Sequence, residues 1–282
     1  MKLVRFGDKG SEKPGILDDD GAIRDASGEV DDYRPETIGP ELLDRLRRLD
    51  PAALPRVDAG VRLGAPIART GHFIAIGLNY EDHAREAGMA IPNEPIIFSK
   101  APSSLNGPND DVILPPNSEK GDWELELGIV IGRRASYVDK GESLDHVFGY
   151  CIANDVSERA LQLEGTGQWI KGKSCETFGP LGPWLVTPDE IPDPQNLDMW
   201  LDVDGERMQT GNTRTMIFPC AELVAFCSKV MVLEPGDVII TGTPPGVGLG
   251  RKPPRFLKPG ETMHLWIDGL GEQRQKVVRH RG

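Results

Sequence analysis

The stretch of sequence that decides the fold is DWELELGIVIG, residues 122–132. Side chains alternate between the two faces of a strand, so Trp123 shares one apolar face with the next four odd-numbered residues. Glu124 and Glu126 point together from the other face, about 7 Å apart at a rise of ~3.3 Å per residue. Two neighbouring carboxylates repel one another unless solvent or a cation intervenes. The pattern therefore fits either an amphipathic strand with both glutamates in solvent or a pair that binds a cation.

The sequence around this stretch contains many short apolar runs bounded by turn residues, which predict strands. Helices are fewer, and the clearest one covers residues 220–230 after Pro219. The further strands predicted here are residues 73–78, 94–99, 111–114, 148–155, 183–186, 200–205, 236–241, 261–268 and 275–280. We therefore expect a mainly β fold with short helices, of the α+β class.

The beginning of the chain differs from the rest because its strands are short and separated by Gly and Asp clusters. A segment rich in Pro, Gly and Ala then leads into the strand at residue 73. The elements predicted before it are strands at 2–6, 14–17 and 22–25 and a helix at 40–49. We expect residues 1–68 to form a small β-rich subdomain and residues 69–282 to form the larger domain.

Charge and composition exclude several classes of protein. The 282 residues include 44 acidic and 32 basic ones, and a net charge of −12 disfavours nucleic acid and anionic membranes as partners. No apolar run approaches the roughly 18 residues that span a membrane, and no signal-peptide pattern is visible. The four cysteines form no CxxC pair or zinc motif. We therefore expect a cytoplasmic globular enzyme.

A third carboxylate follows an apolar run at residues 148–155. Asp155 ends this run, where a strand can present a site residue, but it also suits the N-cap of a short helix predicted over residues 156–162. Both interpretations are open. If Asp155 joins Glu124 and Glu126, three carboxylates without an adjacent Cys or His favour a hard ion such as Mg²⁺, Mn²⁺ or Ca²⁺.

A histidine and a glutamate are candidates for acid–base chemistry. In GLNYEDHAREAG, residues 77–88, a strand runs into Asn79 and a short helix then ends at Gly88. His83 and Glu86 are three residues apart and share a face of this helix. A carboxylate beside an imidazole orients the ring and raises its basicity, as a general base requires. The alternative is an exposed His–Glu pair on a surface helix.

Two further segments place polar groups among apolar and turn residues. Lys171 and Lys173 lie in residues 169–183, where a lysine could stabilise a developing oxyanion or be solvated on a loop. TGTPPGVG, residues 241–248, could offer backbone N–H groups and a hydroxyl to an anion. Because it lacks the Gly-Lys-Ser/Thr ending of a phosphate loop and the spacing of a dinucleotide motif, NAD is not expected.

Seven segments, taken together and in order, resemble the fumarylacetoacetate hydrolase family. They are GLNYEDHAREAG (77–88), PIIFSKAPSSLNGPND (95–110), DWELELGIVIG (122–132), GYCIANDVSERALQ (149–162), KGKSCETFGPLGPW (171–184), GNTRTMIFP (211–219) and LEPGDVIITGTPPGVG (233–248). The resemblance covers residues 70–282 closely and the first 65 residues loosely. A single Glu-x-Glu pair would not be specific, whereas the ordered set is.

The resemblance implies a fold and a metal site. Proteins of this family have a mixed β-sandwich roll and usually form homodimers. Their Glu-x-Glu pair and the later Asp bind a metal ion, and by motif match these ligands are Glu124, Glu126 and Asp155. The expected cofactor is Mg²⁺ or Mn²⁺, with Ca²⁺ as a substitute under crystallisation conditions.

The resemblance also implies roles for five other side chains. His83 and Glu86 match a catalytic dyad that the family carries on a mobile lid. Lys173 matches a lysine that contacts the substrate oxyanion. Gln162 and Thr243 match residues that contact the substrate.

The implied activity is hydrolysis of a C–C bond in a small anionic keto acid. The expected substrate is a 2,4-diketo acid of acylpyruvate type, which yields pyruvate and a carboxylic acid. The opening of the chain resembles smaller bacterial members named ureidoglycolate lyase or 2,4-diketo-3-deoxy-sugar-acid hydrolase. Oxaloacetate decarboxylase, dienoate isomerase and ureidoglycolate lyase are alternatives with the same site. A non-catalytic metal-dependent binding protein is the alternative from another class, and it would not need the dyad.

Overall fold

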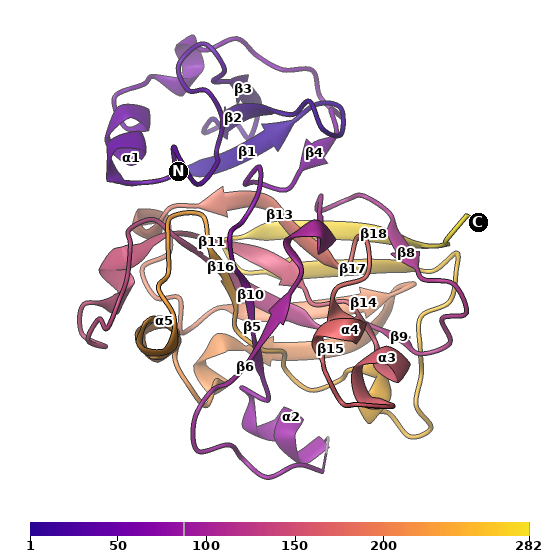
Figure 1. Ribbon diagram of the computed structural model, residues 1–282. Helices are drawn as coiled ribbons and strands as arrows, with labels where there is room; N and C mark the ends of the chain where they lie inside the picture. Colours follow the sequence, from indigo (N-terminus) through magenta and orange to yellow (C-terminus); the bar gives the residue numbers. More distant parts are fainter. Residues whose placement is uncertain (87, 282) are drawn as a thin grey trace.

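The computed structural model describes residues 1–86 and 88–281, and Figure 1 shows the chain as a ribbon. Strands dominate it and the helices are short, which confirms the predicted mainly β, α+β class. The helices of the described residues are α1 (Pro40–Leu46), α2 (Glu81–Glu86), α3 (Arg159–Leu163), α4 (Ile170–Lys173) and α5 (Cys220–Val230). Across these residues we find no helix with the length and apolar character needed to cross a membrane.

The largest sheet has eleven strands in the described residues. Its main path is β3-β2-β1-β13-β11-β10-β16-β5-β6, while β4 pairs with β1 and β7 with β13. The pairs β16–β5 and β13–β7 are parallel and the others are antiparallel, so the sheet is mixed. Its strands are β1 (Lys2–Phe6), β2 (Lys13–Leu17), β3 (Ile23–Asp25), β4 (Leu63–Gly64), β5 (Phe73–Gly77), β6 (Ile96–Lys100), β7 (Leu105–Asn106), β10 (Leu125–Ile131), β11 (Val147–Asn154), β13 (Gly179–Val186) and β16 (Val238–Ile240).

A second sheet packs against the first and encloses the main core. Its order is β15-β14-β17-β18-β8, and a separate pair joins β12 to β9. Leu125 and Leu127 of β10 share one buried cluster with Leu201 and Leu265 of the second sheet, as the alternation of apolar residues predicts. These strands are β8 (Val112–Leu114), β14 (Asp198–Val203), β15 (Glu206–Asn212), β17 (Thr262–Ile267) and β18 (Gly271–Arg279), with β9 (Gly121–Asp122) and β12 (Ser157–Glu158) forming the pair.

The opposite face of β10 packs against the beginning of the chain. Val130 lies in a second buried cluster that also contains Leu3, Ile16 and Leu46. Strand β1 pairs with β13, where Leu3 lies opposite Leu185. In Figure 1, β1, β2, β3 and α1 lie together above the rest of the chain. Whether residues 1–68 are a subdomain distinct from residues 69–282 stays a prediction.

Three local expectations need correction. The helix expected over residues 156–162 begins only at Arg159, because β12 precedes it and the Glu158 carboxylate, not Asp155, caps it by accepting from Ala160 N. Helix α4 and strand β15 were not predicted. The signal for β15 was the Asp204-Gly205 turn, where both residues have positive φ, as a tight hairpin requires. Helix α5 has the predicted bounds.

Candidate active site

The two carboxylate motifs meet because β10 and β11 are antiparallel neighbours. Leu125 lies opposite Asn154, so Glu124 precedes one strand where Asp155 follows the other, and Asp155 N donates to Glu124 O at 2.8 Å. Glu124, Glu126 and Asp155 are only 6%, 1% and 0% exposed, so the interpretation with both glutamates in solvent is wrong. One oxygen of each carboxylate lies within 4.8 Å of the others. Three side chains from two motifs therefore form one buried acidic centre.

Lys173, which lies on helix α4, balances part of the negative charge of the acidic centre. Its ammonium lies 2.5 Å from Glu124 Oε2 and 2.6 Å from Asp155 Oδ2. Burial opposes its charge, but the two carboxylates outweigh burial and raise the pKa of Lys173. The interpretation of two solvated lysines is therefore wrong for Lys173, while Lys171 is exposed.

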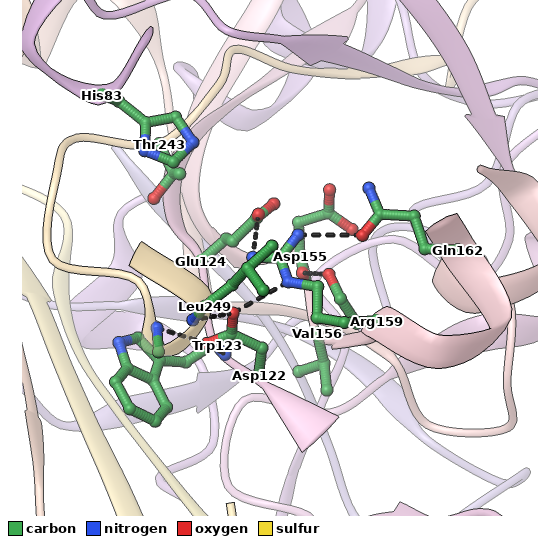
Figure 2. A network of polar contacts seen from close by, with 12 residues as sticks. His83, Asp122, Trp123, Glu124, Asp155, Val156, Arg159, Gln162, Thr243 and Leu249 are labelled. Atoms are coloured by element: carbon green, nitrogen blue, oxygen red, sulfur yellow. Dashed lines mark hydrogen bonds and ion pairs between the residues drawn. The ribbon is translucent and has the colours of Figure 1, made fainter. Parts of the chain in front are cut away.

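Arg159 is a functional candidate that the sequence reasoning missed. Figure 2 shows its guanidinium at the centre of a polar network, and its distances are 2.6 Å to Glu124, 2.8 Å to Asp122 and 2.9 Å to Gln162. Burial opposes ionisation of Glu124, but Arg159 and Lys173 outweigh it and lower its pKa to about 2. The available signal was an arginine inside the short segment that already contained two candidates.

Glu126 is in the opposite electrostatic situation. Its carboxylate accepts a hydrogen bond from Gly242 N at 2.7 Å. Burial, with repulsion from Asp155 and Glu124, raises the pKa of Glu126 well above its ordinary value. A divalent cation between the three carboxylates would remove this repulsion, and an all-oxygen donor set suits Mg²⁺ or Mn²⁺. The acidic centre therefore fits a divalent-metal site.

Lys100 is a second residue that the sequence reasoning missed, and it contacts the acidic centre from strand β6. It ends β6, is fully buried, and donates to Asp155 Oδ1 at 2.5 Å and to the carbonyl oxygen of Lys173 at 2.5 Å. Burial lowers the pKa of Lys100, although the charge of Asp155 opposes that change. Its contacts fix Asp155 and the end of α4 in one arrangement.

The predicted dyad forms on α2. His83 Nδ1 lies 3.2 Å from Glu86 Oε2, and both oxygens of Glu86 accept from Gly246 N at 3.1 Å. His83 is only 8% exposed, so an exposed pair on a surface helix is the wrong interpretation. The outer face of α2 is formed instead by Asp82 and Arg85, which are exposed.

The loop after β16 binds the carboxylates of the protein itself. Its backbone N–H groups donate to Glu126 from Gly242, to Glu86 from Gly246, and to Asp122 from Gly248 and Leu249. The prediction that this loop offers N–H groups to an anion is thus met by anions within the chain. Through its hydrogen bonds to Glu86 and Glu126, the loop connects the dyad to the acidic centre.

Thr243, in the same loop, uses its hydroxyl within the protein. It donates to Leu125 O at 2.9 Å and accepts from Gln209 Nε2 at 2.8 Å. Gln209 was not predicted, and it also accepts from Leu125 N at 3.0 Å. Thr243 therefore fixes the loop against β10.

A cavity of about 500 Å³ brings the candidates together. Phe98 and Trp169, whose rings lie edge to face at 5.2 Å, contribute apolar surface to it. Gly77 is needed beneath Trp169, because a Cβ there would lie 2.6 Å from the ring. The predicted residues that line the cavity are His83, Glu86, Glu124, Glu126, Gln162, Lys173 and Thr243.

Comparison with known families identifies this arrangement. Residues 72–278 match the family described as Fumarylacetoacetate (FAA) hydrolase C-terminal, which is most of the chain. The chain belongs to the fumarylacetoacetate hydrolase family. This confirms the resemblance found in the sequence, and the FAH-like fold follows from the solved structures of related proteins.

Relatives in the family have more than one reaction in their names. A Burkholderia ambifaria protein, provisionally named a hydrolase, is 59% identical over 98% of this chain and 99% of its own length. The structure of a probable 2-hydroxyhepta-2,4-diene-1,7-dioate isomerase from Mycobacterium abscessus matches at 35% identity and a TM-score of 0.86, covering 100% of both chains. Maleylpyruvate hydrolase from Sphingobium sp. SYK-6, in complex with manganese(II) ion and pyruvate, matches at 32% identity and a TM-score of 0.81, again over 100% of both chains.

Proposed function

We propose that this chain is a divalent-metal-dependent hydrolase that cleaves a C–C bond in a 2,4-diketo acid of acylpyruvate type. The products are pyruvate and a carboxylic acid. The observation that carries the proposal is one cavity lined by His83 and by Glu124, Glu126 and Lys173. Such a hydrolase needs a base for water and positive charge for the enolate that leaves, and this cavity provides both.

The metal is assigned to Glu124, Glu126 and Asp155, and a divalent cation there would polarise the carbonyl oxygen of a bound keto acid as a Lewis acid. Mg²⁺ is the proposed ion and Mn²⁺ the alternative. The manganese and pyruvate found with the maleylpyruvate hydrolase support both the kind of ion and a small keto acid as ligand.

His83 is assigned the role of general base. With Nδ1 bonded to Glu86 Oε2, neutral His83 carries its proton on Nδ1, which leaves Nε2 to accept a proton from water. The water oxygen adds to the carbonyl carbon farther from the carboxylate, and the adjacent C–C bond breaks. The acyl fragment leaves as the carboxylic acid, and the other fragment takes up a proton and leaves as pyruvate.

Lys173 is assigned to the negative charge that develops on the pyruvate fragment. Its contacts with Glu124 and Asp155 use two of the three N–H donors of the ammonium, and the third is assigned to the substrate oxygen. Gln162 and Thr243 are assigned to substrate contacts. Because the Thr243 hydroxyl already donates to Leu125 O, it contacts the substrate as an acceptor.

Isotope-labelled water tests the proposed reaction. The full chain with Mg²⁺ or Mn²⁺ is incubated with a series of acylpyruvates in H₂¹⁸O, and the products are identified by NMR and mass spectrometry. Hydrolysis forms one new C–O bond, so one ¹⁸O enters the released carboxylic acid. The pyruvate fragment gains only a proton in this step. Absence of cleavage across the series contradicts the proposal.

An isomerase is the second candidate, because the relative from Mycobacterium abscessus carries that name. The same dyad could move a proton between two carbons of a dienoate without an attacking water. In D₂O this reaction gives a product with deuterium on carbon and an intact carbon chain. A homodimer in the cytoplasm stays our expectation for the assembly and its location, and the mass of the protein in solution tests the dimer.

A further inference from the structure

A buried glutamine of the second sheet has no role in the proposed hydrolysis. Gln209 lies on β15, is 0% exposed and stands outside the lining of the cavity. Its side-chain amide makes three hydrogen bonds, two of them to the loop after β16. We propose that Gln209 is a positioning residue that holds this loop against β10, so that Gly246 N stays in place to bind Glu86 of the dyad. This inference rests on the proposed function, because it concerns turnover at that site.

The strand at the acidic centre has a neighbour on one edge for only part of its length. β10 pairs with β11 along all of its residues, but with β16 only at residues 128–130. Leu125, between the two glutamates of the acidic centre, lies beyond the pairing with β16. Its N–H donates to Gln209 Oε1 at 3.0 Å, and its carbonyl oxygen accepts from Thr243 Oγ1 at 2.9 Å. Two side chains therefore take the place of a strand at this point.

The amide of Gln209 completes a closed ring of hydrogen bonds with these two residues. Its Nε2 donates to Thr243 Oγ1 at 2.8 Å and to Pro244 O at 2.7 Å. A hydroxyl has a single proton, so Thr243 accepts from Gln209 and donates to Leu125 O. All three hydrogen bonds of the amide are made within the protein, and buried polar groups are costly to leave without a partner. The ring therefore fixes the start of the loop against β10.

The loop also lies so close to β15 that two glycines are required. A Cβ at Gly246 would overlap Met208 O, and a Cβ at Gly211 would lie 2.6 Å from Pro244 Cβ. Met208 and Gly211 lie on either side of Gln209 along β15. The close contacts and the hydrogen bonds of the amide thus act on the same part of the loop.

This part of the loop leads directly to the group that binds the dyad. Gly246 follows Pro244 by two residues, and its N–H lies 3.1 Å from both oxygens of Glu86. Glu86 Oε2 in turn lies 3.2 Å from His83 Nδ1. Because α2 has only six residues, its position depends on this contact. A shift of the loop should therefore displace the dyad and leave the carboxylates at β10 in place.

Gln209→Met tests the inference, because it keeps a side chain of similar length and removes all three hydrogen bonds. We expect kcat for acylpyruvate hydrolysis to fall about tenfold, with KM and Mn²⁺ affinity within about twofold of the wild type. The loss is smaller than the roughly 10²-fold of a 1 Å displacement, because Asp122 still binds Gly248 and Leu249. In a His83→Ala background the same change should alter the residual rate by less than about twofold, since no base remains to be positioned.

Gln273→Met is the matched control. Gln273 is also 0% exposed, and its amide also makes three hydrogen bonds, to Ile152 O, Gly182 O and Gln275 Nε2. These partners belong to β11, β13 and β18, so the change should cost similar stability and keep wild-type kcat.

Gln209→Glu is the second variant, and it decides the question if Gln209→Met does not fold. Burial favours the neutral acid, which keeps an oxygen for Leu125 N and has one donor in place of two. Its kcat should lie between those of the wild type and Gln209→Met, and below the wild type by at least about twofold.

Amide hydrogen exchange of the Mg²⁺-loaded full chain, followed by NMR, tests the same inference without turnover. In either Gln209 variant Gly246 N–H should exchange faster, by about tenfold in Gln209→Met, because its contact with Glu86 is weakened. Asp155 N–H, which donates to Glu124 O, should keep its wild-type rate.

Four results would overturn the inference: wild-type kcat in the Gln209 variants, an equal loss of kcat in Gln273→Met, a tenfold effect that persists in the His83→Ala background, or unchanged exchange at Gly246. Absence of acylpyruvate cleavage by the wild type, together with the expected change in exchange, would instead overturn the proposed function alone.

Discussion

The acidic centre and the dyad face one cavity but are held in different ways. Glu124 and Asp155 flank the ends of paired strands, and their carboxylates are bonded to the buried cations Arg159 and Lys173. The dyad lies on α2, which has only six residues and an exposed outer face. Among the described residues, the side-chain hydrogen bonds that join the dyad to the rest of the protein are the two between the Glu86 carboxylate and Gly246 N.

This difference separates a preorganised region from one that depends on docking. A helix of six residues is not stable by itself in water, so the position of α2 depends on its contacts with the loop after β16. The carboxylates, by contrast, are fixed by sheet pairing and by buried ion pairs. We therefore expect metal binding to be independent of the dyad, whereas turnover needs both regions.

The largest effect is expected from Glu126→Gln. The change removes one of three assigned metal ligands and keeps the shape of the side chain. Loss of a residue that only supports a ligand already costs about 10–100-fold in metal affinity, so loss of a ligand should cost at least about 100-fold. Mn²⁺ titration measures the affinity, and acylpyruvate cleavage should fall with it. Wild-type affinity in this variant would remove Glu126 from the site.

The second-largest effect is expected from His83→Ala, which should show that turnover depends on the dyad whereas metal binding does not. We expect hydrolysis to fall by roughly 10²–10⁴-fold, because the base is lost, while Mn²⁺ affinity stays within about twofold of the wild type. The control is Asp82→Ala, an exposed neighbour on α2, which should leave both quantities unchanged. Full hydrolysis in His83→Ala would exclude the assigned role in activating water.

A smaller effect is expected from pH. Burial, Asp155 and Glu124 raise the pKa of Glu126, so its carboxyl keeps a proton to higher pH, and that proton must leave before metal binds. Mn²⁺ affinity should therefore increase with pH, by up to about tenfold per pH unit while one proton is displaced. For the metal-free protein the same shift means that stability contributed by this carboxyl decreases as pH rises.

Titrations of Mn²⁺ over a range of pH that starts at the ordinary pKa of a carboxyl group and extends upward check this expectation. Glu124 should not contribute in this range because its pKa is about 2. An affinity that is constant over the range would contradict the raised pKa of Glu126.

The smallest effect is expected from Gly250→Ala, which acts on the docking of α2. A Cβ at this position would lie 2.5 Å from Glu86 Cδ, so the carboxylate must move away from Gly246 N. We expect about a fivefold loss of kcat with unchanged Mn²⁺ affinity, because the end of a flexible side chain can shift by less than the ~1 Å that costs about 10²-fold. Gly141→Ala is the control, since a Cβ there has no neighbour within 4 Å. Unchanged kcat in Gly250→Ala would mean that the loop does not position the dyad.

Much of the candidate site could be predicted from short segments of sequence. The alternation from Trp123 to Ile131 predicted the buried face of β10, and the spacing of His83 and Glu86 predicted a shared helix face. The bounds of α5 were also predicted. These features depend on the periodicity of consecutive residues, which the sequence displays directly.

Other features depend on which distant segments meet, and local periodicity carries no information about that. Pairing of β10 with β11 decided that Glu124 and Asp155 share one site, and it buried both glutamates that the pattern alone would allow in solvent. Closure of the loop after β16 decided that backbone N–H groups bind Glu86, Glu126 and Asp122.

The roles of Arg159 and Lys100 were decided in the same way. Neither residue belongs to a pattern of its own, and each becomes significant because the fold brings its cation to a buried carboxylate. A buried carboxylate requires such a partner, since its charge has lost the solvation of water. The sequence by itself therefore determined most of the elements and the chemical groups of this protein, whereas the tertiary structure decided which charges balance one another.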